Sequence, residues 1–151
     1  MHSMVRRFIK TAIGFLFIGL AIGGWLLVRR EFAGVLASPY ETSAHTHALF
    51  VGFVMMMILG VALWLFPRPA QDDVRYSPTA INVAYWFLTL GTVGRIGGEL
   101  ARVQWSAPML RLGIVACGAA QVIGVSIFFL TMWTRIRAVG SQLRERQGER
   151  F

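Results

Sequence analysis

A long uncharged apolar run constrains the fold of this chain more than any other feature. The run extends from Ala48 to Phe66 and is closed by Pro67 and Arg68. A helix needs about 20 predominantly apolar residues to cross a hydrocarbon core of roughly 30 Å, and this run supplies nearly that number. It therefore predicts a membrane-spanning helix.

Two of the three histidines, His45 and His47, lie at the entrance of this run. Side chains two positions apart on a helix point about 200° apart. Two histidines that chelate one metal ion from a helix are spaced three or four residues apart. On a helix, His45 and His47 are therefore expected to face two different partners. On a strand or loop they could share one copper or zinc ion.

The composition indicates an integral membrane protein. The 151 residues are 56% hydrophobic, with a mean hydropathy of +0.59, which suits several membrane spans. The chain has 15 Lys and Arg against 7 Asp and Glu, and the basic residues lie between the apolar runs. This placement favours a role in membrane topology over nucleic-acid binding. The single cysteine, Cys117, can form no intrachain disulfide.

Four apolar runs predict an all-α fold with four transmembrane helices in a single membrane domain. The predicted spans are residues 11–28, 46–66, 79–95 and 109–134, followed by a charged cytoplasmic tail at residues 135–151. The first run is long for a signal peptide and lacks a clear cleavage site, so we interpret it as a span. Residues 31–43, 67–78 and 95–108 are predicted to connect the spans.

The distribution of Lys and Arg predicts the orientation in the membrane. Ten fall in the N-terminal segment, the second connection and the tail, and five fall on the other side. Both termini are therefore expected to be cytoplasmic. His45 and His47 would then lie toward the outer face, near four arginines that could pair with an anionic group. These are Arg29, Arg30, Arg95 and Arg102.

Small and polar residues inside the spans predict contacts between helices. Arg95 and Glu99, four residues apart, are expected to pair with each other, and Asn82 and Gln121 to hydrogen-bond to neighbouring helices. Small residues recur at spacings that allow helix backbones to approach closely. The rows are Gly19 and Gly23, Gly94 and Gly98, and Ala116, Ala120 and Gly124.

Haem is favoured over copper as the partner of the two histidines. Imidazole is a preferred ligand of haem iron, copper and zinc. The divergent histidines and the nearby arginines, which suit haem propionates, favour haem. A mononuclear copper or zinc site would need further ligands, and His2 is predicted on the opposite side of the membrane. The consecutive methionines at residues 55–57 suit Cu(I) but point in three directions, which favours packing.

The histidine helix also resembles a known family. His45-x-His47, followed by residues 49–60 (LFVGFVMMMILG) and 64–68 (WLFPR), resembles the haem-binding helices of the catalytic subunit of haem-copper oxidases and nitric oxide reductases. It is most similar to small four-span proteins described as subunit I-like or cbb3-type-like. In that family, twelve spans form three arcs of four around a pseudo-threefold axis, with haems between the arcs. One helix presents His-x-His, and each histidine binds a different haem.

The resemblance implies a haem b protein in which His45 and His47 are iron ligands. The family's copper-ligating histidines and cross-linked tyrosine have no counterpart in a chain with three histidines, so no catalytic residue is predicted. The expected function is bis-histidine electron transfer or the handling of a diatomic gas. The alternatives are an accessory or assembly protein that handles haem or copper for a respiratory oxidase, and a purely structural membrane subunit.

A partner is expected, because one His-x-His pair cannot close a bis-histidine haem. The resemblance favours a homotrimer, which would reproduce three arcs of four spans with haem at the protomer interfaces. A homodimer is the alternative. A respiratory electron donor is a further expected partner, and the expected location is the cytoplasmic membrane of a bacterium or archaeon.

Overall fold

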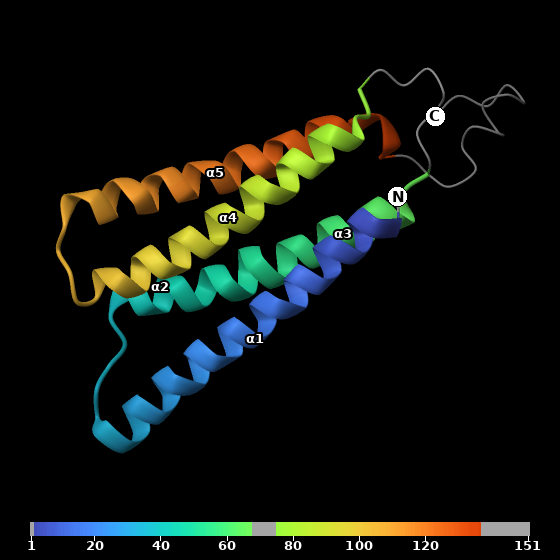
Figure 1. Ribbon diagram of the computed structural model, residues 1–151. Helices are drawn as coiled ribbons and strands as arrows, with labels where there is room; N and C mark the ends of the chain where they lie inside the picture. Colours follow the sequence, from blue (N-terminus) through green and yellow to red (C-terminus); the bar gives the residue numbers. More distant parts are fainter. Residues whose placement is uncertain (1, 68–74, 137–151) are drawn as a thin grey trace, which may run out of the picture.

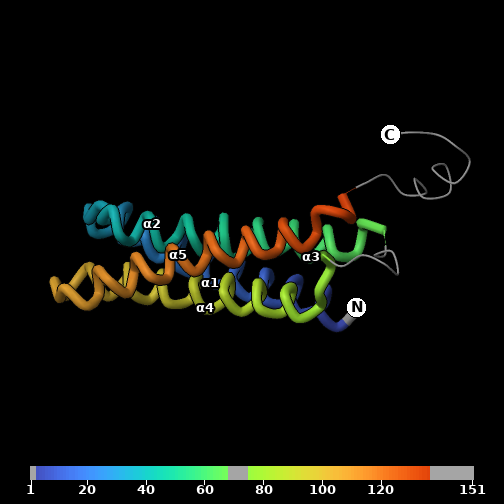
Figure 2. Tube along the Cα trace, turned by 90° about the horizontal axis from the view of Figure 1, so that it is seen from above, coloured from blue at the N-terminus to red at the C-terminus, as the bar shows by residue number. Residues whose placement is uncertain are grey.

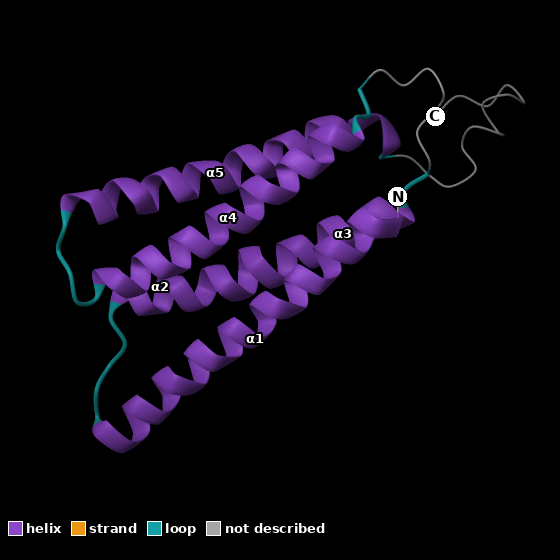
Figure 3. Cartoon of the chain, in the orientation of Figure 1, coloured by secondary structure: helices purple, strands orange, loops and turns teal. Residues whose placement is uncertain are grey.

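Four long helical segments make up the structure, a computed structural model that describes residues 2–67 and 75–136. The segments run alternately in opposite directions along one axis (Figure 1 and Figure 2). Every regular element in these residues is helical (Figure 3). The elements are α1 (His2–Ala33), α2 (Pro39–His47), the π-helical segment η1 (Ala48–Met55), α3 (Met56–Leu65), α4 (Pro78–Arg102), α5 (Pro108–Met132) and the 3₁₀ turn η2 (Trp133–Arg135).

The all-α prediction is confirmed, and three of the four segments are long and apolar enough to cross a membrane. These are Ser3–Ala33, Pro39–Leu65 and Pro108–Arg135. The span predicted at residues 79–95 lies within α4, which is less apolar and carries Asn82 and Arg95. Its passage through a membrane stays a prediction, as do the four-span topology and the cytoplasmic termini. The predicted tail beyond residue 136 lies outside the described residues.

The first connection is shorter than the predicted range 31–43. Helix α1 continues to Ala33 and ends at Gly34, whose φ is +65°. The Gly34 N–H donates to the Arg30 carbonyl at 3.1 Å. A left-handed residue after the last turn is a common way for a helix to end, and glycine adopts this conformation without a Cβ clash.

A capping box starts α2 before the predicted span begins at residue 46. The Ser38 hydroxyl accepts a hydrogen bond from the Glu41 N–H at 3.2 Å, and the Glu41 carboxylate accepts one from the Ser38 N–H at 2.7 Å. Pro39 occupies the first turn, where its missing N–H leaves no bond unmade. Both histidines are therefore helical, and the strand or loop alternative does not apply.

The third segment also extends beyond its predicted end at residue 95. Helix α4 continues to Arg102, and the connection to α5 is correspondingly short. The predicted pairing within this extension is confirmed, since Arg95 Nε donates to Glu99 Oε1 at 3.0 Å. The ion pair lies one turn inside the helix rather than in a loop.

Glycines allow close approach between neighbouring segments, as the small-residue rows predicted. Gly19 of α1 faces Leu49, and a Cβ on Gly94 of α4 would lie 2.5 Å from the Cys117 sulfur of α5. A Cβ on Gly124 would lie 3.1 Å from a backbone carbonyl of α4. Ala116 is exposed, so this member of its row makes no such contact.

The segments share an aromatic core at one end, and α1 separates from the others at the opposite end. Phe8 of α1 makes edge-on contacts with Tyr85 of α4 and Phe128 of α5, with ring centroids 5.2 and 5.9 Å apart. Toward its other end α1 diverges from α2 (Figure 1). Trp25 and Phe32 there are 62% and 88% exposed. The end that carries the histidines is therefore the more open one.

Arg135, predicted to begin the charged tail, is instead completely buried. Its guanidinium donates to the carbonyls of Leu63, Phe66 and Pro67 at 3.3, 3.0 and 2.7 Å. It also lies 4.8 Å above the centre of the Tyr76 ring. The last carbonyls of a helix have no partner within the helix, so a buried cation is well placed to satisfy them. Arg135 thus fixes the end of α5 against the end of α3.

Replacing Arg135 should destabilise the fold. Arg135→Ala would leave buried carbonyls without donors, and we expect a loss of about 2–4 kcal/mol in the free energy of unfolding. The measurement is thermal unfolding in detergent, followed by circular dichroism. Arg30→Ala is the control, because Arg30 pairs with Glu31 on the surface and should cost under about 1 kcal/mol. Equal stability of the two variants would contradict the capping role.

Candidate functional site

His45 lies between α2 and α1. Its Nδ1 is 2.9 Å from the Gly19 carbonyl oxygen. The ring is packed on Gly23, where a Cβ would lie only 2.6 Å from His45 Cε1. The predicted Gly19 and Gly23 row therefore has a specific use, because it leaves room on α1 for an imidazole.

His47 lies on the other side of α2, toward α4. Its Nδ1 is 2.8 Å from the Ser43 carbonyl oxygen and 3.2 Å from the Ser43 hydroxyl. The nearest charged group is Glu99 of α4, whose Oε2 is 3.9 Å from His47 Nδ1. The two imidazoles contact different helices, so the predicted divergence is confirmed and the structure does not bring them together.

The two histidines share one chemical feature. In each ring Nδ1 contacts a backbone carbonyl, which can only accept a hydrogen bond, so the ring hydrogen belongs on Nδ1. Nε2 then carries the free lone pair. Metal-binding histidines commonly donate their other N–H to a carbonyl or carboxylate, which fixes the tautomer and the ring orientation. In each imidazole, Nε2 is therefore the atom that could bind a metal.

A buried polar network supports His47. The Ser43 hydroxyl donates to Glu99 Oε1 at 2.8 Å, and the same oxygen accepts from Arg95. Arg95 also donates to Gln121 at 3.4 Å, and Gln121 donates to a threonine of α4 at 3.0 Å. Glu99 is only 3% exposed, and its buried Oε2 has no hydrogen-bond partner among the residues that the structure describes. The prediction that Gln121 bonds to a neighbouring helix is confirmed.

The π-helical segment follows His47 directly. It covers Ala48–Met55, after which α3 continues as an α-helix. π-helical turns are rare, and they occur frequently at functional sites. Gly52 within it packs against Phe15 of α1, where a Cβ would lie 2.5 Å from the ring. The change in helix type alters the rotation between the histidines and the apolar part of the span.

The four predicted arginines lie at the histidine end, and each has a partner. Arg29 pairs with Glu41 at 2.7 Å, Arg30 with Glu31 at 2.8 Å and Arg95 with Glu99 at 3.0 Å. Arg102 donates to the Trp105 carbonyl at 3.1 Å and lies 5.5 Å from the centre of the Tyr40 ring. Within residues 2–67 and 75–136, Arg102 is thus the one of the four that has no carboxylate partner.

A hollow of about 380 Å³ lies between α1, α2 and α4; His45 is not among its described lining residues but lies one turn away from it. It is close to His45 because Glu41 precedes the histidine by one turn, and Ile22 adjoins Gly23. Among the described lining residues, Glu41 is the charged one and the rest are apolar. The lining residues are Ala21, Ile22, Trp25, Leu26, Glu41 and Leu100. Its size falls within the range of small-molecule sites.

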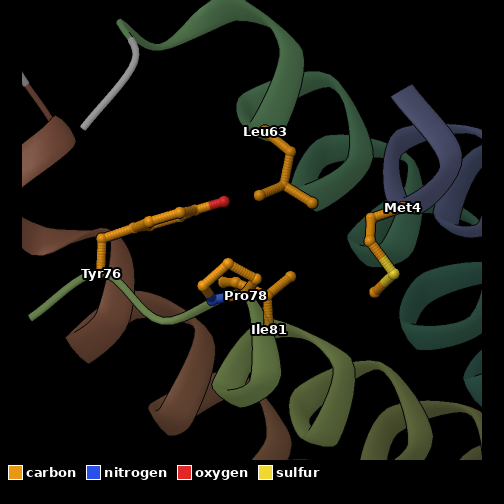
Figure 4. A pocket seen from close by; sticks show the side chains of 5 residues that line it. All are labelled: Met4, Leu63, Tyr76, Pro78 and Ile81. Atoms are coloured by element: carbon orange, nitrogen blue, oxygen red, sulfur yellow. The ribbon is translucent and has the colours of Figure 1, made fainter. Parts of the chain in front are cut away.

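A second cavity, of about 180 Å³, lies at the opposite end of the molecule from the histidines. Tyr76 enters it from one side and Met4 from the other, with Leu63, Pro78 and Ile81 between them (Figure 4). None of its described lining residues carries an imidazole or a carboxylate. The cavity beside His45 is therefore the one that concerns the candidate site.

The fold and the site define a helical membrane protein with two imidazoles presented at the open end of its helices. The chain belongs to a family described as a domain of unknown function (DUF8744), whose model matches residues 2–138. No curated protein and no solved structure matches the chain. The resemblance to haem-copper oxidases therefore stays a prediction.

The close packing of His45 on Gly23 can be tested through stability. Gly23→Ala would force the imidazole or α1 to move, and overpacking of this kind costs about 1–3 kcal/mol in the free energy of unfolding. Gly24→Ala is the matched control, since nothing lies within 4 Å of a Cβ there. Thermal unfolding in detergent measures both variants.

The double variant H45A/G23A identifies the cause of this loss. Without the imidazole, the added methyl group has space, so Gly23→Ala should then cost little. If the methyl group destabilises the protein equally with and without His45, the contact is not the cause.

Proposed function

We propose that this protein binds haem b in the membrane through His45 and His47, and that it transfers electrons or handles a diatomic gas. One observation carries the proposal: each imidazole has Nδ1 committed to a carbonyl, at 2.9 and 2.8 Å, and keeps Nε2 as the donor atom. Histidine nitrogen is a common axial ligand of haem iron. Bound haem would supply the redox chemistry, and the chain's own residues would hold and orient it.

The number of available ligands favours haem over copper. In the parts of the chain that the structure describes, no three His, Cys, Asp or Glu side chains are grouped to hold a metal ion. A mononuclear copper or zinc site normally needs three or four protein ligands. A porphyrin supplies four ligands to its iron, so one or two imidazoles suffice. The apolar hollow beside His45 also suits a flat, largely apolar ring.

Arg102 is the residue best suited to pair with a haem propionate. Of the four arginines predicted to pair with an anionic group, the other three are already neutralised by Glu41, Glu31 and Glu99. A guanidinium can bind a carboxylate through two parallel hydrogen bonds. Arg102 can bind a propionate in this way without first breaking an ion pair with a carboxylate of the protein.

The divergence of the imidazoles supports a shared haem between protomers. His45 faces α1 and His47 faces α4, so one iron cannot take both from the same chain. In the proposed assembly, four spans with both termini cytoplasmic form one arc, and three copies surround a threefold axis. His45 of one protomer and His47 of its neighbour then bind the same iron. The proposed location is the cytoplasmic membrane of a bacterium or archaeon.

Histidine replacement tests the haem ligation directly. The purified protein should show sharp reduced α and β bands, and His45→Ala or His47→Ala should remove the low-spin character and open a position for carbon monoxide. The measurement is the absorption spectrum, oxidised and reduced, with and without carbon monoxide. Because each haem would use one His45 and one His47, the two substitutions should have equal effects.

His2→Ala is the control and should leave the spectrum unchanged. Arg102→Gln should keep six-coordinate iron but release haem more readily on dilution, whereas Arg30→Gln should not. A wild-type protein without haem that binds Cu(I) would overturn the proposal in favour of the accessory role. Unchanged spectra in both histidine variants would overturn the ligand assignment.

Complementation tests the trimer. Native mass spectrometry in detergent should find three chains and three haems. Co-expression of His45→Ala with His47→Ala should restore low-spin haem at about a quarter of the interfaces in a random mixture, because each variant supplies the ligand that the other lacks. A two-chain particle, or a monomer that keeps low-spin haem, would contradict the threefold assembly.

A further inference from the structure

One hydroxyl hydrogen, on Ser43, bears on the tautomer of His47. Ser43 Oγ lies 2.8 Å from Glu99 Oε1 and 3.2 Å from His47 Nδ1. A hydroxyl has a single hydrogen and two lone pairs, whereas a carboxylate can only accept. The Ser43 hydrogen must therefore go to Glu99, and Ser43 Oγ can only accept from His47.

Both oxygens around His47 Nδ1 are consequently acceptors. The second is the Ser43 carbonyl, at 2.8 Å. If the Ser43 hydrogen were free, it could instead be donated to Nδ1, and the ring hydrogen would then move to Nε2. A protonated Nε2 has no lone pair for a metal. The direction of one hydrogen bond thus affects whether His47 can be a ligand.

The polar network keeps the Glu99 carboxylate in the position where it accepts the Ser43 hydrogen. Glu99 is 3% exposed, and its Oε1 also accepts from Arg95 at 3.0 Å. Arg95 is in turn bonded to Gln121 of α5, so three helices fix the carboxylate. Buried polar groups are held strongly by such bonds, because leaving one unpaired is costly.

We propose that Glu99 is a positioning residue: by accepting the Ser43 hydroxyl hydrogen it keeps that hydrogen from competing for His47 Nδ1, so the Ser43 carbonyl retains the ring hydrogen there and Nε2 stays free to bind iron. The inference deepens the proposed function, on which the role of Nε2 rests. Within the described residues, His45 Nδ1 contacts the Gly19 carbonyl and has no contact with a hydroxyl or a carboxylate. Both imidazoles are thus held by a backbone carbonyl, and of the two it is His47 that also has a hydroxyl beside Nδ1, so His45 serves as an internal reference.

The test is the tautomer of each histidine, measured by ¹⁵N NMR of histidine-labelled protein in detergent at about pH 8, where an unperturbed imidazole is neutral. The chain has three histidines, and His45→Ala and His47→Ala identify two of the signals. Wild-type His47 should carry its hydrogen on Nδ1. A hydrogen on Nε2 in the wild-type protein would overturn the proposal at once.

The decisive variant is R95L/E99L, which removes the ion pair as a pair and so avoids an unpaired buried charge. It frees the Ser43 hydrogen, and the ratio of the two His47 tautomers should shift about tenfold toward Nε2–H, the effect of one hydrogen bond of ordinary strength. Adding Ser43→Ala should return the ratio to its wild-type value, because the competing hydrogen is gone. The His45 signal should not change in either variant.

A merely structural role of Glu99 gives a different pattern. It predicts that adding Ser43→Ala to R95L/E99L disturbs the structure further and does not restore the His47 tautomer ratio. It also predicts that the His45 signal changes. An unchanged His47 ratio in R95L/E99L would also overturn the proposal. The measurement needs no haem, so a colourless protein would defeat the proposed function while the tautomer result is judged separately.

Discussion

A polar group in an apolar interior must find its partner within the protein, and this constraint shapes the structure at both ends. At one end, the completely buried guanidinium of Arg135 donates hydrogen bonds to the last carbonyls of α3. At the other end, the Glu99 carboxylate accepts hydrogen bonds from Ser43 and Arg95. Unpaired groups in such surroundings cost several kcal/mol by transfer estimates, so each network stabilises the packing of the helices that it joins.

The sequence predicted the helices well and their ends poorly, for a physical reason. Runs of apolar residues mark the part of a helix that lies in lipid, but not the polar turns that extend it. The capping box at Ser38 and Glu41 and the glycine end of α1 use local hydrogen bonds that hydropathy does not register. The S-P-x-E pattern would have located the start of α2.

The candidate site was predicted in part. The divergence of His45 and His47 followed from helix geometry, and the Arg95–Glu99 pair from its spacing. The partners of the imidazoles did not follow, because the Gly19 carbonyl belongs to another helix and carbonyls leave no signature in a sequence. Ser43, four residues before His47, had the spacing of a helical neighbour and could have been found. The π-helical segment had no sequence signal that we can identify.

Stability and the proposed chemistry are concentrated at opposite ends of the molecule. At one end, Phe8 packs against Tyr85 and Phe128, and the buried Arg135 joins the ends of α3 and α5. At the histidine end α1 diverges, and Trp25 is 62% exposed beside an apolar hollow. A site that must admit a large flat ring and share its ligands with a neighbouring chain requires such an open end. A fixed framework is also needed, because ligand geometry tolerates deviations of only about half an ångström. Separating the two roles along the helix axis meets both demands.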